Sequence, residues 1–103
     1  MIKVEINYKG HGLDSLRVKG HANSGPYGHD LVCAAVSAVT IGALNALEQE
    51  DAYDIDIDEG DVKLVANKPI EEHDMTVIET LIIQLKTIET SYKGTIDIKE
   101  RKD

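Results

Sequence analysis

The chain has 103 residues, of which 42% are apolar, and it carries a formal net charge of −8 at pH 7. This length favours one domain with a small core, and this apolar content argues against a disordered chain. The acidic balance excludes a surface built to bind the phosphate backbone of nucleic acid, which needs clustered Lys and Arg. The single cysteine excludes an internal disulfide and is typical of a protein of the reducing cytoplasm.

The beginning of the chain predicts a β-hairpin. Apolar and polar residues alternate over residues 2–8 and again over residues 15–19, with the period of two that is typical of half-buried strands. Gly10 and Gly12 mark the turn between the two strands. The second strand is expected to end near Gly20, which places His21 at an edge of the sheet.

A polar loop then leads into an apolar helix. Two glycines and a proline mark residues 23–29 as loop, and Asp30 is expected to be the N-cap of a helix that runs to about Leu47. This helix is apolar around nearly its whole circumference, so we expect it to be covered on more than one side. Polar residues and a glycine interrupt it, which favours a buried core helix over a membrane span.

The second half of the chain predicts two more strands, a helix and a final strand. Residues 53–58 alternate with aspartates, residues 59–61 form a turn, and residues 62–64 continue as a strand. Helical spacing of apolar residues predicts an amphipathic helix from Glu71 or Glu72. Residues 95–99 alternate again and precede a charged tail at 100–103.

The resulting order is β-β-α-β-β-α-β. Short hairpin links favour antiparallel pairs, so we predict an α+β fold in which a mostly antiparallel sheet packs with two helices. All residues from 1 to 103 are expected to form a single domain. Because so short a chain gives the first helix few neighbours, a homodimer is expected to complete its coverage.

Cys33 and His21 are the candidate nucleophile and base. Cys33 lies three residues beyond the predicted N-cap, where the helix dipole and unpaired N–H groups favour a thiolate and can bind an oxyanion. His21, across the loop, is a suitable partner for a thiolate–imidazolium pair. The alternative is that Cys33 is an inert core residue and His21 an ordinary residue at a strand end.

Two further polar residues share a helical face with Cys33. Asp30 and Ser37 stand three residues before it and four residues after it. Asp30 either orients the histidine or only caps the helix. Ser37 either donates a hydrogen bond into the site or bonds back to a helix carbonyl.

A metal site and a phosphate loop are the rival interpretations of this stretch. His21, His29, Asp30 and Cys33 are all ligand types, but no CxxC or HExxH pattern is present. The Gly25-x-x-Gly28 spacing before a helix is similar to a phosphate loop, but the Lys and Ser/Thr of that motif are missing. We therefore expect no metal and no cofactor.

Two blocks of sequence resemble the ribosomal-processing cysteine protease family, Prp. They are Gly20-His21-Ala22 and Gly28-x-Asp30-x-Val32-Cys33-Ala34-Ala35-Val36-Ser37. The length and element order are also similar over the whole chain. The resemblance implies a cysteine endopeptidase that removes a short N-terminal extension from a bacterial large-subunit ribosomal protein, number twenty-seven.

The resemblance also implies roles for individual residues. His21 would be the general base and Cys33 the nucleophile, with Asp30 and Ser37 supporting the site. The family's mobile loop, which orders over substrate, would here consist of Asn23, Ser24, Gly25, Pro26, Tyr27, Gly28 and His29. One departure is the turn after the second helix, at residues 92–94, which lacks the proline expected in the family.

The implied partner is the N-terminal peptide of the ribosomal protein, within a cytoplasmic homodimer that binds neither nucleic acid directly nor a membrane. Two alternatives stay open. The chain could be a non-catalytic, dimeric ribosome-assembly factor in which Cys33 is only part of the core. It could also be a thiol-dependent hydrolase of another substrate, such as a thioester.

Overall fold

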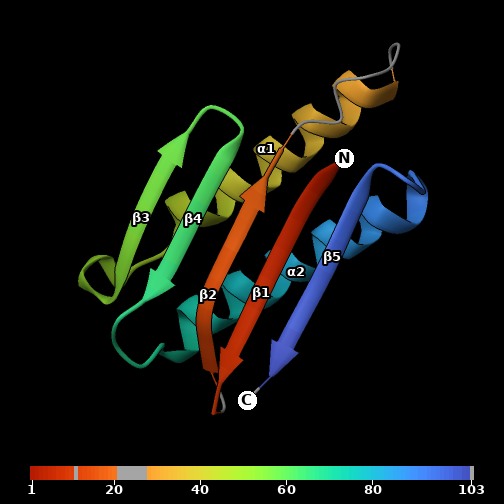
Figure 1. Cartoon of the computed structure of the whole chain (residues 1–103). Coiled ribbons are helices and arrows are strands. Elements are labelled where there is room, and N and C mark those ends of the chain that lie inside the picture. The colour runs from red at the N-terminus through yellow and green to blue at the C-terminus, as the bar shows by residue number, and fades with distance from the viewer. Residues whose placement is uncertain (11, 21–27, 103) are drawn as a thin grey trace.

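The computed structural model describes residues 1–10, 12–20 and 28–102, and within them one five-stranded sheet lies beneath two helices. Both helices cover the same face of the sheet (Figure 1). The elements in chain order are β1 (Ile2–Lys9), β2 (Gly12–Lys19), α1 (Gly28–Ala46), a 3₁₀ turn (Glu50–Ala52), β3 (Tyr53–Asp58), β4 (Asp61–Ala66), α2 (Glu72–Ser91) and β5 (Ile96–Lys102). The predicted β-β-α-β-β-α-β order is confirmed.

The sheet is mostly antiparallel, as predicted. Its strand order is β3-β4-β2-β1-β5, and β5 is the exception because it pairs in parallel with β1. In Figure 1 the red and blue strands accordingly run in the same direction. The first and last strands of the chain are therefore neighbours, and β1 is held on both sides.

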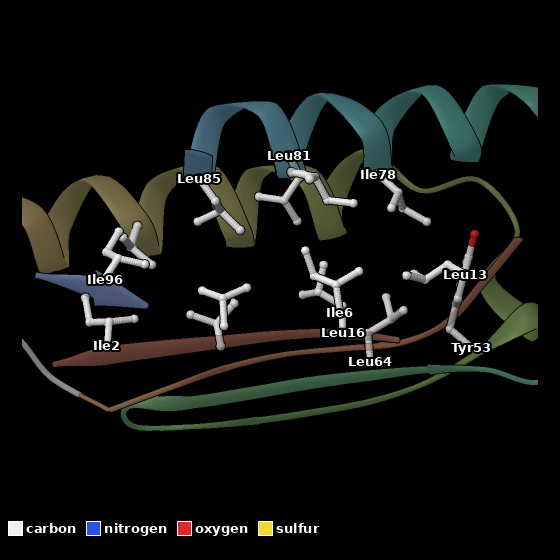
Figure 2. Packing of buried hydrophobic residues seen from close by; sticks show 14 of the residues in the cluster. Ile2, Ile6, Leu13, Leu16, Tyr53, Leu64, Ile78, Leu81, Leu85 and Ile96 are labelled. Atoms are coloured by element: carbon white, nitrogen blue, oxygen red, sulfur yellow. The ribbon is translucent and has the colours of Figure 1, made fainter. Parts of the chain in front are cut away.

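One face of the sheet carries the core. Alternate residues of β1, namely Ile2, Val4 and Ile6, are at most 2% exposed, and Leu16 on β2 and Leu64 on β4 continue the same layer. Figure 2 shows Ile78, Leu81 and Leu85 of α2 pointing onto this layer. The opposite face pairs charged and polar residues across strands, which suits contact with water.

The first helix differs from the prediction in two ways. It begins at Gly28, so Asp30 lies inside its first turn and is not the N-cap. Within the described residues, the sheet and α2 cover it, and part of its surface stays exposed. Val32, Val36 and Thr40 form the buried stripe, whereas Leu31 is 63% exposed. The apolar composition of α1 did not require all its sides to be buried, because most of its exposed positions hold small residues, which are tolerated at a surface.

The predicted charged tail is part of a strand. β5 continues to Lys102, and the tail residues are fixed by neighbouring elements. The Tyr8 hydroxyl donates to Glu100 at 3.0 Å, and Lys86 of α2 forms an ion pair with the same carboxylate. Lys102 lies over the ring of Tyr8, with its Nζ 5.8 Å from the ring centroid. The charges of Glu100 and Lys102 therefore do not mark a free tail, because both groups contact β1 or α2. No helix of the described residues is both long enough and apolar enough to cross a membrane.

Asp74 joins the start of α2 to the segment that follows α1. It is 1% exposed, and its two carboxylate oxygens accept hydrogen bonds from the backbone N–H groups of Glu48 and Gln49 at 2.9 and 3.0 Å. The buried hydroxyl of Tyr53 donates a third bond at 2.7 Å. Burial by itself would raise the pKa of Asp74, but these three donors outweigh it and hold the pKa below its ordinary value.

Replacing Asp74 with Asn is expected to destabilise the protein by about 2 kcal/mol, because an amide cannot accept all three hydrogen bonds. Since the folded pKa is lowered, the carboxylate stabilises the fold above about pH 4 and this contribution disappears as the pH falls through the folded pKa. Urea unfolding at pH 7 and at pH 3 measures both effects. Asp74→Asn should reduce the loss of stability on acidification.

Asp56→Asn, on an exposed strand position, serves as the control. Equal pH dependence of stability in the two variants would contradict the role given to Asp74.

Candidate active site

Cys33 lies in the second turn of α1, on the side that faces the sheet. The sequence predicted it in the first turn, but α1 begins five residues earlier, at Gly28. The side chain is half-buried and packs against the core. Only the first four N–H groups of a helix lack helical partners, so those available for an oxyanion belong to residues 28–31 rather than to Cys33 itself.

A cavity of about 330 Å³ opens beside Cys33. It lies between α1, the adjoining ends of β1 and β2, and the turn that joins β3 to β4. From α1 it is lined by Cys33, Ser37 and Thr40, which stand at i, i+4 and i+7 and so share one helical face. Val18 and Val62 line it from the sheet. Its volume is at the lower end of the range for small-ligand pockets.

The mouth of the cavity is acidic. Asp58, Glu59 and Asp61 line it from the turn between β3 and β4. Arg17 of β2 fixes this turn by two hydrogen bonds to Asp61, with Nε–Oδ1 at 3.0 Å and Nη2–Oδ2 at 2.7 Å. The hydrogen bonds from Arg17 hold the pKa of Asp61 below its ordinary value, so the carboxylate stays charged. Arg17 therefore balances the charge of Asp61, and the other acidic residues at the mouth are Asp58 and Glu59.

Gly20 brings the chain to this cavity immediately before His21. It lines the cavity wall, and its N–H donates to the carbonyl oxygen of Gly60 at 2.8 Å. Its φ is +102°, and a Cβ at this position would lie 2.9 Å from the carbonyl oxygen of Met1. Only glycine fits this close approach without strain. The residue that precedes His21 thus borders the same cavity as Cys33.

The described part of the chain brings together two of the predicted site residues, Cys33 and Ser37. His21 and the loop residues Asn23, Ser24, Gly25, Pro26 and Tyr27 lie outside the described residues. Gly28, His29 and Asp30 belong to the first turn of α1, but the side chains of His29 and Asp30 lie outside the description. Among the described residues no group of three or more His, Cys, Asp or Glu side chains could hold a metal ion.

Two parts of the cavity wall, Thr40 and the turn at residues 58–61, were not predicted from the sequence. Thr40 continues the helical spacing from Cys33 through Ser37, so this periodicity could have found it. The turn at residues 58–61 could not have been placed there, because its position depends on β4 pairing with β2, from which it is separated in the sequence by α1 and β3.

The sequence model of the family described as cysteine protease Prp matches residues 1–97. The chain belongs to this family. The ribosomal processing cysteine protease Prp of Staphylococcus aureus is 33% identical over 101 residues, which cover 93% of this chain and 95% of the relative. The Bacillus subtilis protein of the same name is 35% identical over 95 residues, covering 84% and 85%. The protein is therefore a cysteine protease, a hydrolase.

Solved structures agree with this assignment. The essential ribosomal processing protease Prp from S. aureus, in complex with a covalently linked product peptide, is 33% identical, with a TM-score of 0.85 over 97% of this chain and 99% of that one. The same protease with a substrate peptide gives a TM-score of 0.86 at 32% identity, over the same shares of the two chains. The sheet and helices described above are thus those of Prp-family structures.

Replacing Gly20 with Ala is expected to destabilise the protein by more than about 1 kcal/mol, since the positive φ and the Met1 carbonyl both oppose a side chain there. Thermal unfolding followed by circular dichroism measures the change. Gly12→Ala is the matched control, because a Cβ at Gly12 meets nothing within 4 Å. If Gly20→Ala melted at the same temperature as Gly12→Ala, the close approach at the cavity wall would be disproved.

Proposed function

We propose that this protein is an endopeptidase that removes the short N-terminal extension of a bacterial large-subunit ribosomal protein, number twenty-seven. Cys33 is the nucleophile and His21 the general base. The observation that carries this proposal is that Cys33 and Gly20, the residue before His21, line one cavity. The S. aureus relative bound to a covalently linked product peptide supports it, because a covalent link to a peptide is what a nucleophilic cysteine forms.

The reaction follows the chemistry of a thiolate–imidazolium pair. The Cys33 thiolate attacks the scissile carbonyl carbon and forms a C–S bond. N–H groups at the start of α1 hold the oxyanion. The C–N bond breaks as protonated His21 gives its proton to the leaving amine. Water, deprotonated by His21, then attacks the thioester, and the C–S bond breaks to release a carboxylate and restore the thiolate. No metal or cofactor takes part.

The supporting roles fall to residues close to Cys33. Asp30 orients the imidazole of His21. Ser37, one turn beyond Cys33 on the cavity wall, donates a hydrogen bond to the substrate. The loop at residues 23–29 closes over the bound peptide, and its two glycines and proline suit such a gate.

The substrate partner is the N-terminal peptide of the ribosomal protein, bound as an apolar, extended segment. The net charge of −8 is compatible with a basic partner protein and disfavours direct contact with nucleic acid. β3 is an edge strand, and its residue Ile57 lines the cavity, so an extended peptide can lie along this edge and reach Cys33. The protein works in the cytoplasm, where ribosomal proteins are made.

The decisive experiment is cleavage of the extended ribosomal protein by purified wild type, Cys33→Ala and His21→Ala, with mass spectrometry to locate the cut. Wild type is expected to cut once near the substrate's N-terminus. Each variant should lose about a thousandfold or more in rate, because the nucleophile and its base act as a unit. Cleavage that survives Cys33→Ala would remove Cys33 as the nucleophile.

If folded, reduced wild type does not cleave this substrate, alkylation separates the alternatives. A non-catalytic assembly factor predicts that Cys33 reacts slowly with iodoacetamide at neutral pH and that His21→Ala changes nothing. A thiol-dependent hydrolase of another substrate predicts fast alkylation that His21→Ala slows. A panel of peptides and thioesters then identifies the substrate class.

We also propose that the active form is a homodimer. A groove of about 800 Å³ runs between α1 and α2, and Ala38, Gly42 and Ala46 line it from α1. These small residues allow close approach of a second copy, which would cover the exposed side of α1. Light scattering after size exclusion should give twice the monomer mass at micromolar concentration, and a monomer mass would contradict the dimer.

A further inference from the structure

An ion pair on the open face of the sheet holds the turn that walls the cavity. Arg17 lies between the buried Leu16 and Val18 on β2, so its side chain points to the face of the sheet opposite the helices. There its two hydrogen bonds hold Asp61, the first residue of β4. Two parallel bonds between a guanidinium and a carboxylate define orientation as well as distance, which a single ionic contact does not.

The turn between β3 and β4 lacks the favoured geometry of a two-residue hairpin. Asp58 pairs with Asp61 across it, and these like charges repel each other. The two-residue turns that suit the twist of a hairpin need a positive φ at their first residue. Gly60, the second residue, has a φ of +74°, but no described residue other than glycine has a positive φ, so Glu59 does not. The contact with Arg17 therefore supplies a constraint that the turn itself lacks.

The same turn holds the end of β2. The N–H of Gly20 donates to the carbonyl oxygen of Gly60 at 2.8 Å, which extends the ladder between β2 and β4 by one bond. On another side, the backbone of Gly20 lies so close to the carbonyl oxygen of Met1 that a Cβ would not fit. Gly20 is thus placed by two backbone contacts, and it is covalently bonded to His21. The position of the turn therefore determines where the chain enters His21.

We propose that Arg17 and Asp61 are positioning residues for His21. Their ion pair fixes the turn, and the turn fixes Gly20 at the point where the chain enters His21. The inference rests on the proposed function, because it takes His21 as the base that serves Cys33. Arg17 lies outside the lining of the cavity and on the far side of the sheet, so it acts through this backbone path. A displacement of about 1 Å in an active site can lower a rate by about a hundredfold.

An ion pair that only stabilises the fold predicts a different result. The side chains of Arg17 and Asp61 are 38% and 30% exposed, and partly exposed ion pairs contribute little to the free energy of unfolding. Loss of this pair should therefore lower the melting temperature only slightly. Positioning predicts a loss of reaction rate out of proportion to this loss of stability.

The pH dependence of alkylation at Cys33, the only cysteine, tests the proposal without a peptide substrate. Rates with iodoacetamide are measured by intact-mass spectrometry between about pH 5 and pH 9 for wild type, Arg17→Met, Asp61→Asn and His21→Ala. A well-placed imidazolium supports the thiolate at low pH, so wild type should exceed His21→Ala most at about pH 6. Arg17→Met and Asp61→Asn should each lose about tenfold there and approach His21→Ala. All rates should converge at about pH 9, where the thiolate forms without help.

Lys63→Met is the matched control. Lys63 lies directly opposite Arg17 on the same face of the sheet. The hydrogen bond from Arg17 lowers the pKa of Asp61 most, and the charge of Lys63 adds to this effect. Lys63→Met thus removes a charge beside Asp61 but leaves both hydrogen bonds, and it should react as wild type does. A loss equal to that of Arg17→Met would indicate a general effect of charge and would overturn the proposal.

Arg17→Lys separates geometry from charge at the same position. Lysine keeps the positive charge but cannot form two parallel hydrogen bonds with a carboxylate. Arg17→Lys should therefore resemble Arg17→Met in the alkylation assay. A rate profile like that of wild type would show that charge alone is sufficient and would contradict positioning by the paired bonds. Thermal unfolding followed by circular dichroism confirms that each variant is folded.

Cleavage of the extended ribosomal protein separates this inference from the proposed function. Arg17→Met should lower kcat about tenfold and leave KM within about twofold, because Arg17 lies away from the cavity that receives the peptide. If wild type does not cleave but Arg17→Met still shifts the alkylation profile towards His21→Ala, the substrate assignment fails and the positioning role survives. If wild type cleaves and Arg17→Met equals it in both assays, the positioning role fails and the protease survives. If His21→Ala leaves the alkylation profile unchanged, the catalytic pair and the positioning role both fail.

Discussion

One-sided burial is the constraint on which the rest of the structure depends. Among the described residues, both helices lie on the same face of the sheet, and the buried apolar side chains of the strands point towards that face. α1 and α2 pack on each other and on the sheet, but they leave β3 partly uncovered, and its Ile55 and Ile57 are 40% and 58% exposed. The cavity beside Cys33 is the space that remains between α1 and the turn after β3. The candidate active site thus follows from the limited size of the core.

The elements could be predicted from the sequence because each depends on local periodicity. Alternating residues predicted the strands, and the helical spacing from Ile78 to Leu85 predicted α2. Two predicted boundaries were wrong, namely the start of α1 and the end of β5. An aspartate is favourable both as an N-cap and within the first turn of a helix, so Asp30 did not fix where α1 begins. Residues 100–102 looked like a tail because the partners of their charges, such as Lys86 and Tyr8, are distant in sequence.

The site was predictable only as far as it lies on one helix. Cys33 and Ser37 share a face by helical spacing, and the structure places both at one cavity. The acidic mouth was not predictable, because Arg17 holds Asp61 through the pairing of β2 with β4. The sequence also could not show that the buried Thr40 hydroxyl makes no hydrogen bond within the described residues. A threonine in a helix commonly donates to the carbonyl one turn earlier, as Thr80 does in α2.

The parallel pairing of β1 with β5 has a consequence for how the chain is made. β1 can pair with β2 soon after both are synthesised, but its other neighbour, β5, follows much later in the sequence. Until residues 96–102 leave the ribosome, the backbone of β1 keeps an open edge that other chains can pair with. Folding is therefore completed late and through a contact of long sequence separation, which slows it. A chain that stops before β5 would expose this edge permanently and would be prone to aggregate.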